Sequence, residues 1–284
     1  MKGTRAPWGF LAPYGAIFAM FWAWPIAFSF YVSFLDTRGW PWVWRPSQNW
    51  SRLLGDPLFH KALWNTLFIL VAQVPLMLAL ATALAVALDA PSLRLKGLFR
   101  FAFFAPVVVG AVAYSAVFRL MLNTDFGVVN AALRGIGLPG VDWLNSPIPA
   151  MAAIIAALTW RWTGYNAVIL MAGLQGIPPE LYEAARIDGA STWQQFRFVT
   201  LAGLRPMLVF CAVLSIIGTL QLFTEPFLIT GGGPGNATTT LGVYLYQQGF
   251  RNFNFGYAST VAYAVAALSA AFSLLGRRWF GGEE

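Results

Sequence analysis

PPELYEAARIDGASTWQQFRFVTLAGLRP, residues 178–206, decides the fold, because this charged stretch separates two apolar segments that are each long enough to cross a membrane. Its two opening prolines suit the first turn of a helix, and Gly189 suits the left-handed residue that ends one. Ser191 and Gln194 have the spacing of a capping box, which starts a second helix. The stretch therefore predicts two short helices that meet at one glycine and lie outside the lipid.

The composition is that of an integral membrane protein. Of the 284 residues 58% are hydrophobic and 10% are charged, and the mean hydropathy is +0.62, whereas a soluble domain carries about a quarter charged residues. Six segments have the length and apolar character of a membrane span, at about residues 9–35, 62–88, 101–122, 148–176, 206–230 and 257–276.

These segments predict an all-α, polytopic membrane protein with six transmembrane helices, in which residues 1–284 form a single transmembrane domain and residues 178–205 form the loop of two short helices. The charge-free run at the start of the first segment is too long for the core of a signal peptide, so we expect this segment to be retained.

The charged stretch resembles a known motif. Glu183-Ala184-Ala185, then Gly189, then Val199-Thr200-Leu201 is similar to the EAA loop of permease subunits in binding-protein-dependent ABC importers, although Ala202 stands where that pattern has proline. Residues 172–178 (AGLQGIP) and 228–234 (LITGGGP) resemble the first of the two permeases in carbohydrate importers of the maltose and glycerol-phosphate type. With 65–66 and 255–258, the resemblance covers about residues 10–275.

The resemblance implies alternating access, in which a sugar, most simply a disaccharide or oligosaccharide, moves into the cytoplasm. It implies four kinds of protein or lipid partner: a second permease subunit, two copies of a cytoplasmic ATPase that binds ATP and Mg, an external solute-binding protein, and the lipid bilayer. The chain itself would be no enzyme and hold no cofactor, in keeping with a sequence that has no G-x-x-x-x-G-K-[ST] motif. The residues that would couple it to the ATPase are Glu183, Ala184, Ala185, Asp188, Gly189 and Ala190.

Three other functions stay open. The substrate of such a permease can be a polyol or glycerol phosphate instead of a sugar. An ion-coupled secondary transporter would need buried carboxylates at mid-membrane, and Glu225 alone is available. A membrane-embedded enzyme would need a nucleophile-base pair or a metal cluster, but the chain has one cysteine, Cys211, and one histidine, His60. We therefore expect no catalytic residue, no metal site and no disulfide.

The predicted helix pair can act mechanically. A short rigid helix held in a socket transmits motion as a lever, and small residues at 184 and 185 permit close approach. The alternative is an amphipathic hairpin that lies on lipid headgroups. Such helices are usually rich in Lys and Arg, whereas acidic residues outnumber basic ones here. A protein socket is therefore favoured.

The orientation follows from Lys and Arg. With the N-terminus inside, the inner side holds ten basic residues and the outer side holds seven. The ten inner residues are Lys2, Arg5, Arg94, Lys96, Arg100, Arg186, Arg197, Arg205, Arg277 and Arg278. This count and the resemblance favour the inner cell membrane with both termini cytoplasmic. The net charge of +7 is spread over both faces, so no nucleic-acid partner is predicted.

Charged residues inside predicted spans indicate a substrate path, because each costs roughly 2.5–3.5 kcal/mol when it faces lipid. The candidates are Trp160, Arg161, Tyr165 and Asn166 in the fourth span, and Ser215, Thr219, Gln221 and Glu225 in the fifth. Aromatic faces stack on sugar rings and polar groups bond hydroxyls. Alternatively, the aromatic residues pack between helices, and Arg161 pairs with Glu225 or with backbone carbonyls. Both interpretations stay open from sequence alone.

Overall fold

The computed structural model describes residues 6–90 and 92–280, and side chains within 10–275. The all-α prediction is confirmed for this part, in which the strands are one antiparallel pair, β1 (Leu35–Asp36) and β2 (Val43–Trp44). Four of the basic residues used for the orientation, Lys2, Arg5, Arg277 and Arg278, lie outside the described residues or side chains.

The described contacts divide into two compact units. One contains the residues up to Phe59 together with Tyr244–Ala266, and the other contains His60–Val243 together with the residues from Ala267 onward. The single transmembrane domain stays a prediction.

Four helices in the described part are long and apolar enough to cross a membrane: Phe10–Val32, Pro57–Asp89, Thr192–Leu220 and Phe255–Leu275. A bent pair of helices passes the same test only when it is taken as one span, and α8 (Pro147–Leu174) is long enough but less apolar. α8 is not among the four because its central residues 159–166 are mostly polar or aromatic, which lowers its hydropathy.

The first unit is held together around the start of α4 (Pro57–Asp89). Asp56 caps this helix, because its Oδ1 accepts from the backbone N–H of Leu58 at 2.9 Å. Its Oδ2 accepts from the hydroxyls of Tyr244 and Tyr257, at 2.6 and 2.8 Å, and the Arg52 guanidinium lies 3.9 Å from the centre of the Tyr257 ring. The unit's remaining elements are α1 (Ala6–Phe18), η1 (Ala19–Ala23), α2 (Trp24–Val32), the pair β1 and β2, α3 (Gln48–Gly55), η4 (Gln247–Arg251) and the first part of α13 (Phe255–Phe280). Residues of α12 (Leu241–Tyr246) belong to both units.

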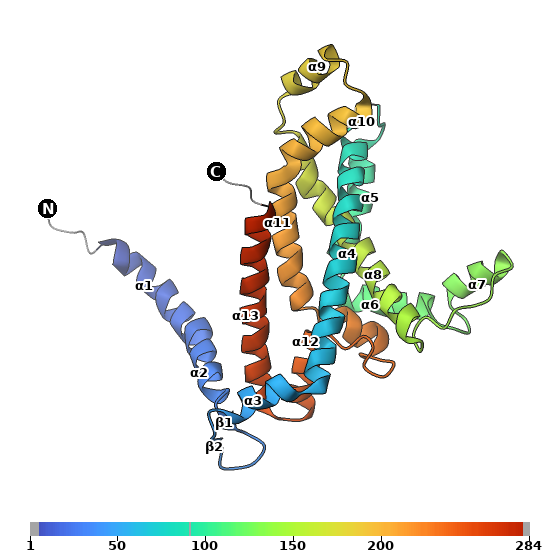
Figure 1. Cartoon of the computed structure of the whole chain (residues 1–284). Coiled ribbons are helices and arrows are strands. Elements are labelled where there is room, and N and C mark those ends of the chain that lie inside the picture. The colour runs from blue at the N-terminus through green and yellow to red at the C-terminus, as the bar shows by residue number, and fades with distance from the viewer. Residues whose placement is uncertain (1–5, 91, 281–284) are drawn as a thin grey trace. The chain divides into compact units, whose positions relative to one another are not determined.

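In the second unit α4, α5 (Lys96–Val108), α8 and α11 (Leu201–Leu220) run side by side (Figure 1). Small residues let α4, α8 and α11 approach closely, since Ala85, Ala167 and Cys211 are completely buried in one apolar cluster. Gly164 has the same role between α8 and α5, because a Cβ there would lie 1.7 Å from the carbonyl oxygen of Phe103. This packing fixes the inner faces of the four helices.

The third predicted span, 101–122, is broken. α5 and α6 (Ala111–Met121) are bent by 95° at Val109 and Gly110, both of which have extended backbone. A β-branched residue followed by glycine disfavours helix at this point. The residues of this predicted span therefore form two helices and not one continuous helix.

The helix at the fifth predicted span, about 206–230, has other bounds than the span. The helix begins at Thr192, continues through α10 (Thr192–Gln195), the π-helical turn η2 (Phe196–Thr200) and α11, and ends at Leu220. Ala202 favours helix where a proline would hinder it, so the second short helix of the predicted loop is the first part of the long helix. Beyond Leu220 the chain is irregular, and a π-helical turn η3 (Pro226–Thr230) follows.

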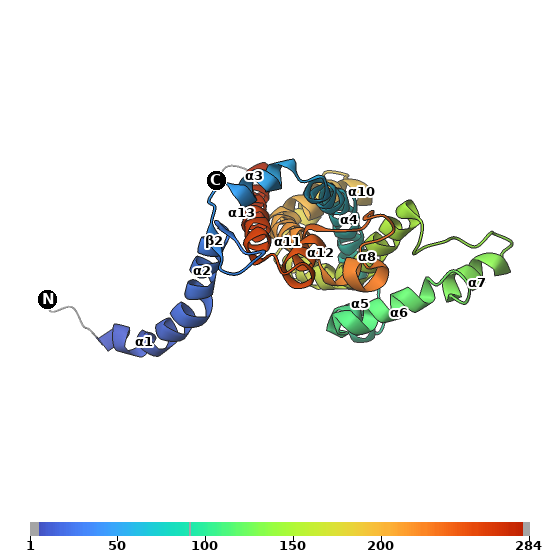
Figure 2. The same ribbon diagram turned by 90° about the horizontal axis from the view of Figure 1, so that it is seen from below.

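A side chain distant in sequence satisfies one backbone group in the break after Leu220. The carbonyl oxygen of Leu222 accepts from the Thr240 hydroxyl at 2.5 Å, as non-helical backbone within a membrane protein requires. Elsewhere in this unit α7 (Val128–Gly135) extends away from α4, α8 and α11 in both views (Figures 1 and 2). Asn130 of α7 fixes the segments on either side of this helix, because its side chain forms hydrogen bonds with Thr124, Val141 and Trp143.

Candidate functional site

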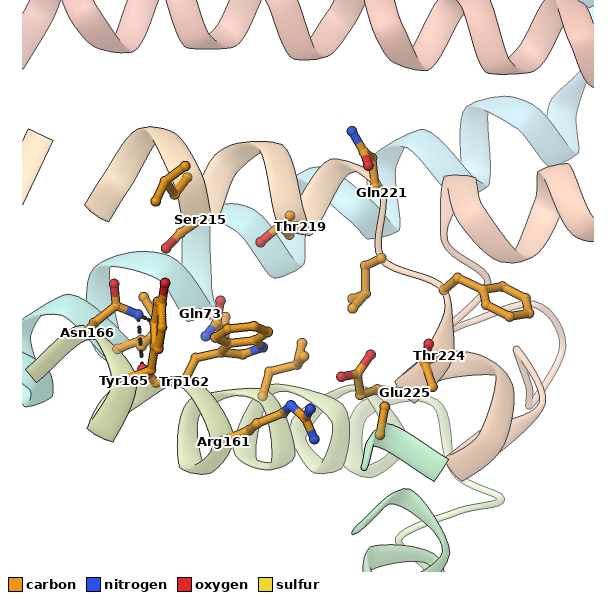
Figure 3. Close-up of a pocket in the computed structure, with 17 residues that line it drawn as sticks. Gln73, Arg161, Trp162, Tyr165, Asn166, Ser215, Thr219, Gln221, Thr224 and Glu225 are labelled. Atoms are coloured by element: carbon orange, nitrogen blue, oxygen red, sulfur yellow. Dashed lines mark hydrogen bonds between the residues drawn. The ribbon is translucent and has the colours of Figure 1, made fainter. Parts of the chain in front are cut away.

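A cavity of about 330 Å³ lies in the second unit between α8, the end of α11 and the segment 221–225, with further walls from α4 and α6 (Figure 3). It is lined by Gln73, Met77, Ala111, Leu158, Arg161, Trp162, Tyr165, Asn166, Leu214, Ser215, Gly218, Thr219, Gln221, Leu222, Phe223, Thr224 and Glu225. The volume is at the lower end of the range of roughly 300–1,000 Å³ for small-molecule pockets.

Seven of the eight predicted path residues line this cavity: Arg161, Tyr165, Asn166, Ser215, Thr219, Gln221 and Glu225. Trp160 does not. Its ring lies 5.4 Å from that of Phe118 and 6.3 Å from that of Tyr114, so it packs against α6. Successive residues of a helix point about 100° apart, and Trp160 therefore faces away while Arg161 faces the cavity.

Sequence reasoning missed several lining residues, of which Gln73 on α4 and Thr224 are polar. Gln73 is only 3% exposed. A single amide within a long apolar span is a signal that was present in the sequence, because a buried amide needs polar partners or water.

Arg161 contacts α6 and the bend between α5 and α6. Its Nη1 donates to the carbonyl oxygen of Val109 at 3.0 Å, which is a carbonyl freed by the bend between α5 and α6. Its guanidinium also lies 4.4 Å from the centre of the Tyr114 ring, a cation–π contact. Of the two structural partners that the sequence left open, the structure shows the backbone carbonyl.

Glu225 lies outside the long helix, in the short helical segment that precedes η3. Its Oε1 accepts from the Tyr114 hydroxyl, and the side chains that the structure describes show no ion pair between Glu225 and Arg161. Tyr114 therefore contacts both charged residues, with its ring against the cation and its hydroxyl on the carboxylate.

Asn166 connects α8 to α4. Its Nδ2 donates to the carbonyl oxygen of Trp162 at 2.9 Å and to the Met77 sulfur at 3.4 Å. The indole of Trp162 meets the Tyr165 ring edge-on, at 5.6 Å between centroids. The cavity thus presents aromatic surface beside amides, hydroxyls, one cation and one carboxylate, which suits a hydroxyl-rich ligand.

The second candidate site is the hairpin that begins with α9 (Pro179–Ile187). The predicted glycine stop is confirmed, since Gly189 has φ of 76°. The N–H of Gly189 donates to the Arg186 carbonyl at 3.0 Å and that of Ala190 to the Ala185 carbonyl at 2.9 Å, the hydrogen bonds of a Schellman motif.

The next helix starts as predicted. The Ser191 hydroxyl accepts from the N–H of Gln194 at 3.3 Å, and the Gln194 side chain accepts from the N–H of Ser191 at 2.7 Å. The capping box is therefore present. Tyr182 and Thr200 share a hydroxyl hydrogen bond of 3.0 Å, which ties α9 to the long helix.

α9 is exposed. Glu183, Ala184, Asp188 and Gly189 are exposed, while Ala185 and Ala190 are half-buried. Two large apolar side chains of this helix are also uncovered: Leu181 is 51% exposed and Ile187 is 87% exposed. The described chain therefore supplies no cover for this apolar surface.

The helices that line the cavity also carry α9. α8 ends at Leu174, five residues before α9 begins, and the long helix starts at Thr192, five residues after α9 ends. α9 lies at one end of these two helices (Figure 1). α9 is therefore joined along the chain to two of the helices that line the cavity.

The chain belongs to the family described as binding-protein-dependent transport system inner membrane component, which matches residues 59–280. It is thus a membrane permease of an ABC importer, and hydrolysis of ATP is the work of a separate subunit. The family resemblance seen in the sequence is confirmed.

Three relatives are similar over most of their length. The chain is 44% identical over 273 residues to the lactose transport system permease protein LacF of Rhizobium radiobacter, which covers 94% of this chain and 91% of the relative. It is 34% identical to the sulfoquinovosyl glycerol transport system permease protein SmoG of Agrobacterium fabrum, covering 91% and 85%. It is 32% identical to the arabinooligosaccharides transport system permease protein AraP of Bacillus subtilis, covering 97% and 88%.

Solved structures share the fold. A chain of a bacterial ABC transporter involved in the import of the acidic polysaccharide alginate matches with a TM-score of 0.84 at 22% identity, over 96% of this chain and 94% of that one. A chain from a complex of the alginate transporter with its alginate pentasaccharide-bound periplasmic protein matches with a TM-score of 0.81, also at 22% identity, over 96% and 93%.

Proposed function

We propose that this permease carries a sugar, a disaccharide or a short oligosaccharide, into the cytoplasm by alternating access. The names of two relatives refer to lactose and to arabinooligosaccharides. The cavity supports the proposal, because the Trp162 and Tyr165 rings offer flat surface to a sugar ring and the amides of Gln73 and Asn166 offer hydrogen bonds to hydroxyls.

One observation carries the mechanism: α8 and the long helix 192–220 form walls of the cavity at one end and hold the exposed α9 at the other. A helix is stiff along its axis, so a push on α9 becomes a shift of cavity walls. In this proposal Glu183, Ala184, Ala185, Asp188, Gly189 and Ala190 dock into the ATPase, and Leu181 and Ile187 are covered there.

The proposed assembly contains a second permease, two copies of the ATPase, which bind ATP and Mg, and an external solute-binding protein. α9 and both chain termini then face the cytoplasm. The external partner is supported by the alginate transporter of the same fold, which was solved in complex with a periplasmic protein that holds an alginate pentasaccharide.

Reconstitution tests the proposal. The chain is purified with its second permease and ATPase, placed in liposomes and supplied with its binding protein, and uptake of radiolabelled lactose, maltose and cellobiose is followed with and without ATP. Uptake that requires ATP is the expected result. Failure of every neutral sugar, with active ATPase present, would reject the sugar function.

The relative SmoG motivates one alternative, since its name refers to sulfoquinovosyl glycerol. Such a ligand joins an acidic sugar to a polyol. The same liposomes decide between the two substrate classes: preferred uptake of a glycerol-linked or phosphorylated polyol over neutral sugars would favour the alternative.

A further inference from the structure

Most of the polar residues that line the cavity are uncharged. Of the described residues that line it, two are charged: Arg161, on α8, and Glu225, in the segment after the long helix. The lining as described is therefore neutral overall, with one centre of each sign.

The cation is already engaged. One terminal nitrogen of Arg161 donates to the Val109 carbonyl, and the face of the guanidinium lies against the Tyr114 ring. Strong recognition of a carboxylate or sulfonate by arginine uses two parallel N–H donors. In this geometry one donor and one face are committed to the protein.

The carboxylate keeps a free acceptor. Glu225 is 6% exposed, and its Oε1 accepts from the Tyr114 hydroxyl, but Oε2 accepts no hydrogen bond from any described residue. The side chain reaches into the space between α8 and the 221–225 segment (Figure 3). An acceptor on the wall of a cavity can take a hydrogen bond from a ligand, and a sugar hydroxyl is a suitable donor.

We infer that Glu225 is a specificity-determining residue, which accepts a hydroxyl hydrogen bond from a neutral sugar and rejects sugars that carry a carboxylate or sulfonate. This inference rests on the proposed function. Two like charges about 6 Å apart in a partly buried site, where the effective dielectric constant is about 20, disfavour binding on the order of 100-fold. Screening and the nearby Arg161 reduce this, so a preference of at least tenfold is expected.

The test measures binding without the external protein, which could impose a preference of its own. The permease complex is placed in nanodiscs, and equilibrium dialysis compares lactose, maltose and cellobiose with the uronate of each, in which a carboxylate replaces a C6 hydroxymethyl group. The wild-type complex should bind the neutral disaccharide at least tenfold more tightly than its uronate.

Glu225→Gln should bring that ratio close to one, while Glu225→Asp, which keeps the charge, should retain most of it. Asp125→Asn is the matched control, because Asp125 is an exposed carboxylate outside this cavity, and it should change nothing. Each variant must co-purify with its partners before it is compared.

An unchanged ratio in Glu225→Gln, or tighter binding of uronates by the wild type, would overturn the inference and leave sugar transport intact. If neither neutral sugars nor uronates bind the wild-type complex, and liposome uptake is also absent, the proposed function fails and the inference with it.

Discussion

Gly189→Val is expected to uncouple ATP hydrolysis from transport. Gly189 has φ of 76°, and a Cβ built on it meets nothing within 4 Å. The cost of a side chain there is therefore conformational and not steric. For a residue other than glycine this backbone conformation costs about 1–2 kcal/mol, and more for a β-branched one.

The chain can avoid that strain only by leaving the left-handed conformation. It then loses the hydrogen bonds from Gly189 to Arg186 and from Ala190 to Ala185, each worth about 0.5–1.5 kcal/mol net. By either route the hairpin is destabilised by about 1–3 kcal/mol, a factor of roughly 5–150 in its population. The membrane helices do not depend on this turn and should insert normally.

The assay is sugar uptake per ATP hydrolysed in reconstituted liposomes, and the expected fall is at least fivefold. Gly189→Asn should behave nearly as wild type, because asparagine tolerates this conformation. Gly137→Val is the matched control, since Gly137 has φ of 81° and also meets nothing within 4 Å, but it lies beside α7. Equal uncoupling in Gly137→Val and Gly189→Val would show that the turn after α9 has no special part in coupling.

Three further outcomes are expected. Gly164→Ala should lower the melting temperature of the purified complex, because its Cβ would overlap the Phe103 carbonyl and overpacking costs about 1–3 kcal/mol. Gly97→Ala is the control and should leave the melting temperature unchanged, because its Cβ meets nothing within 4 Å. Similar melting temperatures for the two variants would count against the close packing at Gly164. Tyr114→Phe should destabilise the complex by about 1.5–3 kcal/mol, because the hydrogen bond from the Tyr114 hydroxyl to Glu225 is lost. Tyr165→Phe, whose hydroxyl has no described hydrogen bond, is the control in the same thermal assay. Equal shifts in melting temperature for the two variants would show that the bond to Glu225 does not stabilise the complex. Glu183→Lys should reduce co-purification of the ATPase, while Asp125→Asn should leave it intact; full retention in Glu183→Lys would argue against docking at α9.

The hairpin was predictable because its determinants are local. A left-handed glycine and the Ser191–Gln194 capping box are set by residues within a few positions of each other, and both are present in the structure. The family motif lies on the same residues, so the motif and the local physical chemistry lead to the same prediction.

The breaks in the spans were not predictable from hydropathy. Hydropathy measures transfer into lipid, and an apolar segment has the same hydropathy whether it is straight or bent. The turn at Val109 is stabilised by Arg161, which lies 52 positions further along the chain. The irregular backbone near Leu222 is stabilised likewise by the distant Thr240.

The cavity was largely predictable because polar residues in an apolar helix must face protein or water. Seven of eight predicted residues line it. Trp160 lies outside the cavity, and the sequence left both places open, because an aromatic residue is stable both in a cavity and against neighbouring rings such as those of Phe118 and Tyr114.

In the proposed mechanism, motion of α9 reaches the cavity through α8 and the helix 192–220. It is measured most directly by the reactivity of a cysteine at Gln221, in a background in which Cys211 is replaced, toward a small hydrophilic thiol reagent. Gln221 lines the cavity, and Leu220, which is fully buried, provides an inert control position. We predict that the reaction rate at position 221 changes at least threefold between the ATP-bound and nucleotide-free complex, and that Gly189→Val removes the change. An identical rate in both nucleotide states, or a nucleotide-dependent rate that persists in Gly189→Val, would contradict this mechanism.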